Sequence, residues 1–318
     1  MNKPVFIHEN GLTVITATDE VISGMEPAHL NALIDEHGAL LFRGAKGGLE
    51  TFKAFSQRLA SSFSDYRGGG LRFGPLDRDA IGGDNTVLSV TGAGQGFGIP
   101  LHGEMQYLPS PPELLWFYCD EPPQNGGQTT VAPARAVEER LSDATRKFFA
   151  DNRILYKRVL GPDDWRKTFL TEDFDEAKAF CAEQGLTMTQ RSSGTVDVSY
   201  VTDAIRIGPK GERYFINNIL FVQAGEDAFH SGYAKQSLGV DVPEWPFVVR
   251  SEDDQPLPRE ILSDIARASE EETKNIDWQS GDFVVLDNRR ILHGRRESVA
   301  GGKRKILVRM CNRWSGEA

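Results

Sequence analysis

One segment decides the fold predicted for this 318-residue chain: Leu101-His102-Gly103-Glu104-Met105-Gln106-Tyr107. In a β-strand, residues two apart point to the same side of the sheet. His102 and Glu104 can therefore offer an imidazole and a carboxylate to one metal ion. A second histidine would complete a set of two histidines and one carboxylate, which leaves open positions on a non-haem iron.

Among the six histidines of the chain, His293 is the best candidate for the third ligand. It follows a buried strand-like run at 281–288 and a turn, which can carry it back across a two-sheet fold to His102. The other histidines precede the expected core, belong to an early helix or lie in a polar loop: His8, His29, His37 and His230. Spacing alone leaves zinc and manganese open as the metal. It also leaves open that an isolated His-x-Glu is no ligand set.

Short strand-like runs separated by turn residues recur along most of the chain, which is typical of a β-sandwich or jelly roll. The expected strands are 5–17, 39–44, 114–119, 129–132, 154–159, 196–207, 214–219, 282–286 and 305–310. Helices are expected at 26–37, 49–63, 134–152, 172–184 and 257–271. The predicted fold is mainly β with flanking helices, a double-stranded β-helix. One domain is expected over 1–318, with its jelly-roll core at about 98–313 and the helices and strands of 1–97 packed on it.

Composition limits the classes of partner and the compartment. The net charge of −10 argues against nucleic acid, because phosphate contacts need a basic surface. No apolar run is long enough to span a bilayer, and the first residues lack the apolar segment of a secretory signal. Cys119, Cys181 and Cys311 are odd in number and widely spaced, which favours the cytoplasm. A homo-oligomer is compatible with this composition.

Several ordered motifs resemble those of the taurine dioxygenase-like (TauD/TfdA) family. Residues 101–107 resemble its LHxEMxY segment, and Gly126-Gly127-Gln128-Thr129 resembles its GGxT. Residues 38–44 are similar to its GxLLFRG, and 304–308 to its RKILV. The likeness covers about 35–313 and is strongest to the amino-acid hydroxylases of peptide natural-product biosynthesis.

This resemblance implies a jelly roll that uses Fe(II), 2-oxoglutarate and O2. By position, His102, Glu104 and His293 would be the iron ligands. Thr129 falls at the 2-oxoglutarate-binding threonine of the family, where its hydroxyl would donate to the distal carboxylate. Arg304 matches the arginine of the family that binds the same carboxylate, for which a bidentate guanidinium is suited.

The strand register decides which cation faces the co-substrate. Alternation puts Arg304 and Arg309 on opposite faces of a strand, and Lys305 on the face of Arg309. Arg304 is the predicted 2-oxoglutarate ligand. A slip of one residue would replace it with Lys305 or Arg309.

Substrate contacts are expected around the metal and in two loops, 64–74 and 91–99. Gln106, Tyr107 and Arg309 are the predicted substrate-binding residues, although Tyr107 also fits core packing. Val308 stands where some relatives carry a second arginine that binds an acidic substrate group. Recognition of such a group would then fall to other arginines: Arg309, Arg313, Arg67 or Arg72.

The implied reaction is hydroxylation of an unactivated C–H bond. The substrate class is an amino acid or a derivative of one, free or tethered to a carrier protein, in specialised metabolism. Desaturation, epoxidation and cyclisation use the same oxidant and remain alternatives. Halogenation is disfavoured because Glu104 occupies the position that chloride would need. Two other classes are a non-enzymatic metal-binding jelly roll and a zinc hydrolase, in which Glu104 would be consumed as a ligand instead of serving as the base.

Overall fold

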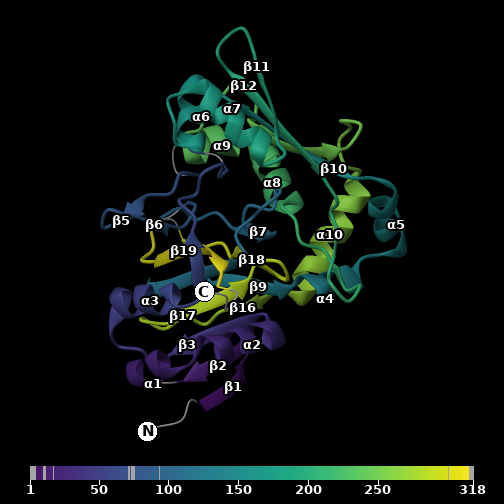
Figure 1. The fold of residues 1–318 in the computed structure, drawn as a ribbon. Coiled ribbons are helices and arrows are strands. Elements are labelled where there is room, and N and C mark those ends of the chain that lie inside the picture. Colours follow the sequence, from purple (N-terminus) through teal and green to yellow (C-terminus); the bar gives the residue numbers. More distant parts are fainter. Residues whose placement is uncertain are drawn as a thin grey trace.

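The computed structural model describes residues 5–9, 12–16, 18–70, 72, 76–92, 94–299 and 301–314. Two β-sheets lie at its centre, with helices on the outer face of one and a large insert beyond the other (Figure 1). Residues 71, 73, 74 and 93 belong to the two loops predicted beside the substrate, and those positions lie outside the described residues.

The large sheet has nine strands in the order β1-β2-β3-β17-β8-β19-β6-β5, with β4 paired to β19. Their bounds are β1 Val5–Glu9, β2 Leu12–Thr16, β3 Ala39–Arg43, β4 Ala60–Phe63, β5 Ala80–Ile81, β6 Asp84–Ser89, β8 Leu114–Glu121, β17 Phe283–Asp287 and β19 Lys305–Arg313. The strands before residue 97 thus extend this sheet and do not merely pack on it.

The small sheet has four strands in the order β16-β9-β18-β7. Their bounds are β7 Ile99–His102, β9 Thr129–Pro133, β16 Lys274–Asn275 and β18 Ile291–Arg295. It packs against the inner face of the large sheet, where the ring of Phe117 on β8 lies 5.4 Å from that of His293 on β18. Alternation along β8 sends Phe117 inward and Trp116 outward.

Three helices precede or follow the first strands: α1 Asp19–Gly24, α2 Pro27–His37 and α3 Gly48–Gln57. Pro27 opens α2, where its missing N–H costs nothing, and Gly38 ends the helix with a left-handed φ of 74°. Helix α3 packs Phe52 and Phe55 against Trp116 on the outer face of the large sheet. These contacts form a second apolar core outside the sandwich.

Residues 134–273, between β9 and β16, form an insert that occupies the top and right of Figure 1. Its strands form a four-stranded sheet, β11-β12-β10-β15, and a two-stranded one, β13-β14. The strand bounds are β10 Ile154–Leu160, β11 Thr187–Gln190, β12 Val196–Thr202, β13 Arg206–Ile207, β14 Arg213–Tyr214 and β15 Phe247–Ser251. The helix bounds are α4 Ala134–Arg140, α5 Asp143–Asp151, α6 Pro162–Phe169, α7 Phe174–Glu183, α8 Ile219–His230, α9 Tyr233–Leu238 and α10 Arg259–Glu272.

Some predicted elements are wrong in type or length. The helix expected at 49–63 stops at Gln57, and its last residues form β4, because Ala60 to Phe63 pair with β19. The strand expected at 214–219 gives way to α8, so that His230 ends a helix instead of lying in a loop. The run at 196–207 is divided between β12 and β13.

None of the described helices is long and apolar enough to cross a membrane. The three cysteines are buried and unpaired.

Candidate metal centre and co-substrate site

Pairing of two strands brings the predicted triad together. In the small sheet, β18 runs antiparallel to β7, with His293 opposite His102. Strand β7 ends at His102, and Glu104 lies in the turn that follows, so that strand alternation is not what places it beside His102. Each of the three residues offers a ligand atom within 4.8 Å of the other two. All three side chains are buried. Two histidines and one carboxylate are the facial set that holds non-haem iron(II).

The protonation of the histidines suits metal binding. Pro100 O lies 2.9 Å from His102 Nδ1, so that this nitrogen carries the proton and Nε2 keeps its lone pair. Burial and the neighbouring His293 lower the pKa of His102 to about 3, which keeps its ring neutral. Among the described residues, His293 Nδ1 has no hydrogen-bond partner although it is buried. A buried nitrogen without a partner is costly unless a ligand satisfies it.

A buried arginine faces the carboxylate of the triad. Arg78 Nη2 donates to both oxygens of Glu104, at 3.2 and 2.9 Å. Burial alone would raise the pKa of Glu104, but the Arg78 guanidinium holds that pKa well below its usual range. Glu104 is therefore a carboxylate at neutral pH, as a metal ligand must be.

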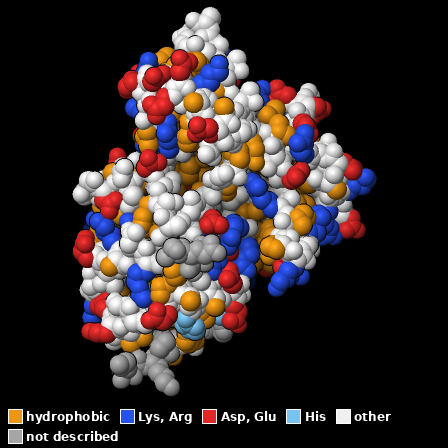
Figure 2. Space-filling view, in the orientation of Figure 1, with side chains coloured by type: hydrophobic (Ala, Val, Ile, Leu, Met, Phe, Trp, Pro, Cys, Tyr) orange, Lys and Arg blue, Asp and Glu red, His pale blue; other side chains and the backbone are white. Residues whose placement is uncertain are grey.

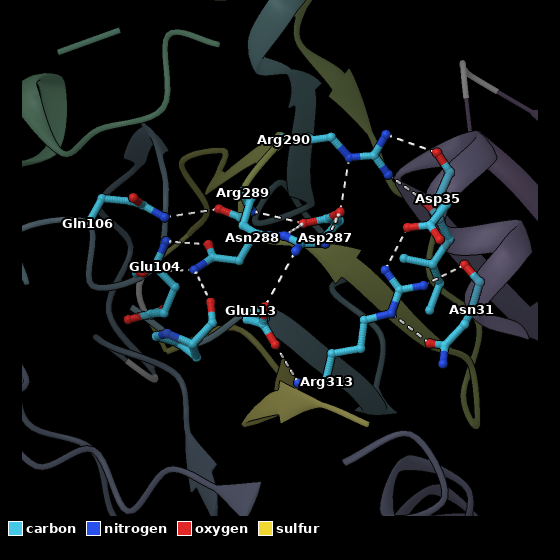
Figure 3. Close-up of polar contacts among 12 residues, drawn as sticks. Asn31, Asp35, Glu104, Gln106, Glu113, Asp287, Asn288, Arg289, Arg290 and Arg313 are labelled. Atoms are coloured by element: carbon cyan, nitrogen blue, oxygen red, sulfur yellow. Dashed lines mark hydrogen bonds and ion pairs between the residues drawn. The ribbon is translucent and has the colours of Figure 1, made fainter. Parts of the chain in front are cut away.

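The backbone of Glu104 is held by the side chain of Asn288, which follows β17 (Figure 3). Asn288 Oδ1 accepts from Glu104 N at 2.7 Å, and Asn288 Nδ2 donates to Glu104 O at 2.9 Å. The same amide donates to Pro112 O at 2.7 Å. Asn288 thus fixes the peptide unit that presents the carboxylate, without contacting the carboxylate itself.

The neighbouring Asp287 ties this turn to helix α2. Its carboxylate accepts from Arg289 Nε and Arg290 Nε, both at 2.9 Å. Arg290 also donates to the carbonyls of Ile34 and Asp35 near the end of α2 (Figure 3). Together these bonds connect the helix to the turn behind the triad.

Thr129 and Arg304 meet beside the triad. Arg304 Nη2 donates to Thr129 Oγ1 at 3.2 Å, and Arg304 Nε donates to Gly127 O at 2.7 Å. Trp278 Nε1 also donates to Thr129 Oγ1, at 3.0 Å. With two donors on its oxygen, the hydroxyl of Thr129 is free to donate its own proton. Burial and nearby Arg295 lower the pKa of Arg304 to about 9, because no carboxylate among the described residues pairs with it.

The strand register separates the three candidate cations. Arg304 precedes β19, and the pairing of β19 with β8 shifts register at the next residue. Lys305 is exposed and pairs with Asp120 at 2.8 Å. Arg309 lies on the outer face, where it donates to Ser56 Oγ and Thr86 Oγ1.

Two of the predicted substrate contacts are therefore corrected. Arg309 lies opposite Trp116 on the outer face of the large sheet and faces α3, not the metal centre. Gln106 is buried and donates to Asn288 O at 3.0 Å, so that it supports the turn and does not line the cavity. Tyr107 does line it.

The remaining arginine candidates are occupied elsewhere: Arg313 pairs with Asp35, Arg67 with Glu176, and Arg72 with Asp77. The sequence reasoning missed Arg78, because a single arginine in a glycine-rich stretch has no spacing that links it to the ligands.

One cavity of about 790 Å³ joins the triad to Thr129 and Arg304 and continues under the insert. Its far wall comes from α8, α9 and the start of β15, and includes Phe221, Val222, Tyr233, Trp245 and Phe247. Hydrophobic side chains also gather where the insert meets the rest of the molecule, near the centre of Figure 2. The cavity thus has a charged end at the triad and an apolar end at the insert.

Comparison with known proteins identifies the family. The model described as "Taurine catabolism dioxygenase TauD, TfdA family" matches residues 17–311. The chain belongs to the TauD/TfdA family. It is a 2-oxoglutarate-dependent non-haem iron oxygenase, with Fe(II) and 2-oxoglutarate as its cofactors. The donor set, the unsatisfied His293 nitrogen and the unpaired Arg304 fit both groups.

Two curated proteins of this family are similar along most of their length. A clavaminate synthase-like protein of Arabidopsis thaliana is 28% identical over 305 residues, covering 89% of this chain and 84% of the relative. Dapdiamide synthesis protein DdaC of Enterobacter agglomerans is 24% identical over 306 residues, covering 95% and 90%.

Solved structures share the fold. AAD-2, in complex with Mn(II) and N-oxalylglycine, has a TM-score of 0.58 at 17% identity, covering 98% of this chain and 97% of that one. PvcB from Pseudomonas aeruginosa has a TM-score of 0.51 at 15% identity, covering 95% and 85%. The predicted mainly β jelly roll with flanking helices is confirmed.

Proposed function

We propose that this TauD/TfdA oxygenase hydroxylates an unactivated C–H bond of an amino acid or an amino-acid-derived substrate in specialised metabolism. In this proposal His102, Glu104 and His293 hold Fe(II), while Thr129 and Arg304 hold the distal carboxylate of 2-oxoglutarate. The substrate enters free or tethered to a carrier protein. The proposal treats residues 1–318 as one functional domain in the cytoplasm, in keeping with three unpaired, buried cysteines.

The observation that carries the proposal is the shared cavity. A metal triad alone would also suit a binding protein, but here the same cavity contains the half-buried guanidinium of Arg304, which has no acidic partner among the described residues. A threonine hydroxyl that already accepts two bonds stands beside it. A dicarboxylate that reaches from the metal to Arg304 would use both.

In this proposal the side chains of the site have separate roles. When bound, Fe(II) and 2-oxoglutarate together supply the activation of O2 and the oxidation of the C–H bond. His102 keeps Nε2 unprotonated through its Nδ1 contact with Pro100. Arg304 and Thr129 orient the co-substrate by charge-assisted hydrogen bonds. Phe117 and Phe221 flank the histidine rings and exclude water from the metal side of the cavity.

Similarity to proteins of specialised metabolism supports the substrate class. One is a dapdiamide synthesis protein, and PvcB is described as an oxygenase from an isonitrile synthetic pathway. Desaturation, epoxidation and cyclisation are the alternative outcomes. The mass of the product separates these outcomes into two groups, because hydroxylation and epoxidation add one oxygen atom, whereas desaturation and cyclisation remove two hydrogens.

The direct test is optical. Anaerobic addition of Fe(II) and 2-oxoglutarate should give a weak visible charge-transfer band in the wild-type protein, and His102→Ala should lose it. The absence of the band in correctly folded wild-type protein would contradict the proposed function. Succinate release measured across a library of free and carrier-bound amino acids then identifies the substrate.

A further inference from the structure

The buried charges around the cavity do not balance. Among the described residues that line it, Arg78, Arg295 and Arg304 are cations, whereas Glu104 is the only buried anion and Glu297 is exposed at the rim. A divalent metal and the 2-oxoglutarate dianion cancel one another. Buried charge without a counter-charge is costly, so the loaded site favours a further anion.

Arg78 has donors to offer this anion. Its Nη2 contacts Glu104, and its Nε donates to Thr91 Oγ1 at 3.0 Å. Within the part of the chain that the structure describes, its Nη1 donates only to the sulfur of Met310, at 4.0 Å. Thioether sulfur is a weak acceptor, so this edge of the guanidinium is poorly satisfied.

The hydroxyl of Tyr107 belongs to a residue that lines the same cavity as Arg78. Tyr107 is 3% exposed and lines the cavity, yet its hydroxyl makes no hydrogen bond with any described residue. Its ring is fixed edge-on by Phe247 at 5.1 Å, and the guanidinium carbon of Arg158 lies 5.3 Å from the ring centre. Arg158 is buried, and the only described acceptors of its guanidinium are the carbonyls of Gly68 and Gly69, so that it adds positive potential.

Tyr66 completes this wall. Its ring lies under the Arg78 guanidinium, 4.5 Å from ring centre to the guanidinium carbon. Tyr66 has a φ of 66°, a left-handed conformation that a bulky residue seldom adopts. Such strain persists only where the surroundings hold it, and it is common at ligand sites.

We propose that Arg78 and the hydroxyl of Tyr107 bind a carboxylate of the substrate beside the metal. The apolar part of the substrate then occupies the apolar end of the same cavity, which α8 helps to line. The inference rests on the proposed function and deepens it, because it favours a substrate with a free carboxylate and an apolar remainder over one that is tethered to a carrier through that carboxylate. It also supplies the acid-binding group that Val308 cannot provide. Trp245 and Phe247 form the apolar wall opposite this pair.

The test uses matched carboxylates and amides as probes. The full-length protein is loaded anaerobically with Fe(II) and 2-oxoglutarate, and 4-phenylbutyrate or 4-phenylbutyramide is titrated while the charge-transfer band is recorded. The carboxylate should perturb the band saturably and bind about tenfold tighter than the amide, equivalent to one charge-assisted contact. Arg78→Met should abolish this preference.

A second variant keeps the test decisive if Arg78→Met disturbs Glu104. Tyr107→Phe removes only the hydroxyl and should weaken the carboxylate about three- to tenfold, leaving the amide unchanged. Tyr118→Phe is the matched control, since Tyr118 is also buried but lies on the outer face of the large sheet. Equal or absent binding of both probes to wild type overturns the inference, as does a Tyr107→Phe protein that behaves like Tyr118→Phe. A wild-type protein without the band contradicts the proposed function instead.

Discussion

A single residue, Asn288, holds Glu104 in place, because its side-chain amide bonds both backbone polar groups of Glu104. It is fully buried and holds Glu104 N and Glu104 O as a neighbouring strand would. Groups that orient a metal ligand from behind usually affect metal affinity nearly as much as the ligand does. Loss of the Asn288 amide is therefore expected to weaken metal binding.

Asn288→Ala should weaken Mn(II) binding about 10- to 100-fold. It should also lower the free energy of unfolding by about 2–4 kcal/mol, since buried backbone groups of Glu104 and Pro112 lose their partner. Calorimetric titration with Mn(II) and urea unfolding check the two effects.

Asn312→Ala is the matched control for this change. Asn312 is exposed and donates only to Ser62 Oγ, at 3.2 Å. It should leave both measurements unchanged. An Asn288→Ala protein that binds Mn(II) as tightly as wild type would show that the turn holds Glu104 without the amide.

At the scale of elements, the turn between β17 and β18 depends on the ionised form of Asp287. Burial alone would raise the pKa of Asp287, but hydrogen bonds and charges from Arg289 and Arg290 lower it below its ordinary value. A carboxyl whose pKa is lower in the folded chain stabilises that chain above its unfolded pKa of about 3.9. The contribution is lost as the pH falls through the lower, folded-state pKa.

Asp287→Asn should lower the free energy of unfolding by about 3 kcal/mol at neutral pH, as expected when one partner of a buried ion pair is removed. The difference from wild type should shrink as the pH falls below about 4. Urea unfolding at a series of pH values measures it. Asp151→Asn, which removes an exposed pair with Lys147, should change nothing. A difference that stays constant with pH would mean that the charge of Asp287 contributes little.

At the scale of the whole molecule, the cofactors link strands that lie far apart in the sequence. His102 and Glu104 lie at and just beyond the end of β7, and His293 lies on β18. The proposed 2-oxoglutarate ligands are Thr129, on β9, and Arg304, just before β19. A ligand that binds only the folded chain stabilises all of these elements together.

Mn(II), added with 2-oxoglutarate at a hundredfold excess over its dissociation constant, should raise the free energy of unfolding by about 2.7 kcal/mol beyond the effect of Mn(II) alone. Arg304→Met should lose most of this co-substrate increment and keep the metal increment. Lys305→Ala, at the adjacent exposed position, should keep both. If Lys305→Ala instead loses the increment, the assignment of Arg304 is wrong. Thermal or urea unfolding provides the measurement.

The sequence was sufficient for features that depend on local spacing. His102 and Glu104 lie two apart and do come together, although Glu104 lies in a turn after β7 and not in the strand that the alternation assumed. The buried strand before His293 indicated the third donor, which the structure brings to the other two. Helix α2 was predicted closely because Leu30, Leu33 and Ile34 have helical spacing and Gly38 marks its end.

Features that depend on distant contacts were not predictable in this way. Alternation in β10 and β12 predicted strands but not their sheet, and they form a separate sheet in the insert. Arg78 and Tyr66 reach the cavity only because irregular backbone carries them there. The face of Arg309 depended on the register of β19 against β8, which the sequence left open.

The insert has a property that concerns how such enzymes diversify. It leaves the small sheet at β9 and returns at β16, and these two strands are paired neighbours, with Lys274 opposite Val131. The segment is thus a cassette whose two ends meet. It supplies the apolar wall of the cavity, whereas the triad, Thr129 and Arg304 all lie outside it. Exchange of this cassette between relatives would replace the specificity of the enzyme while preserving its oxidising machinery.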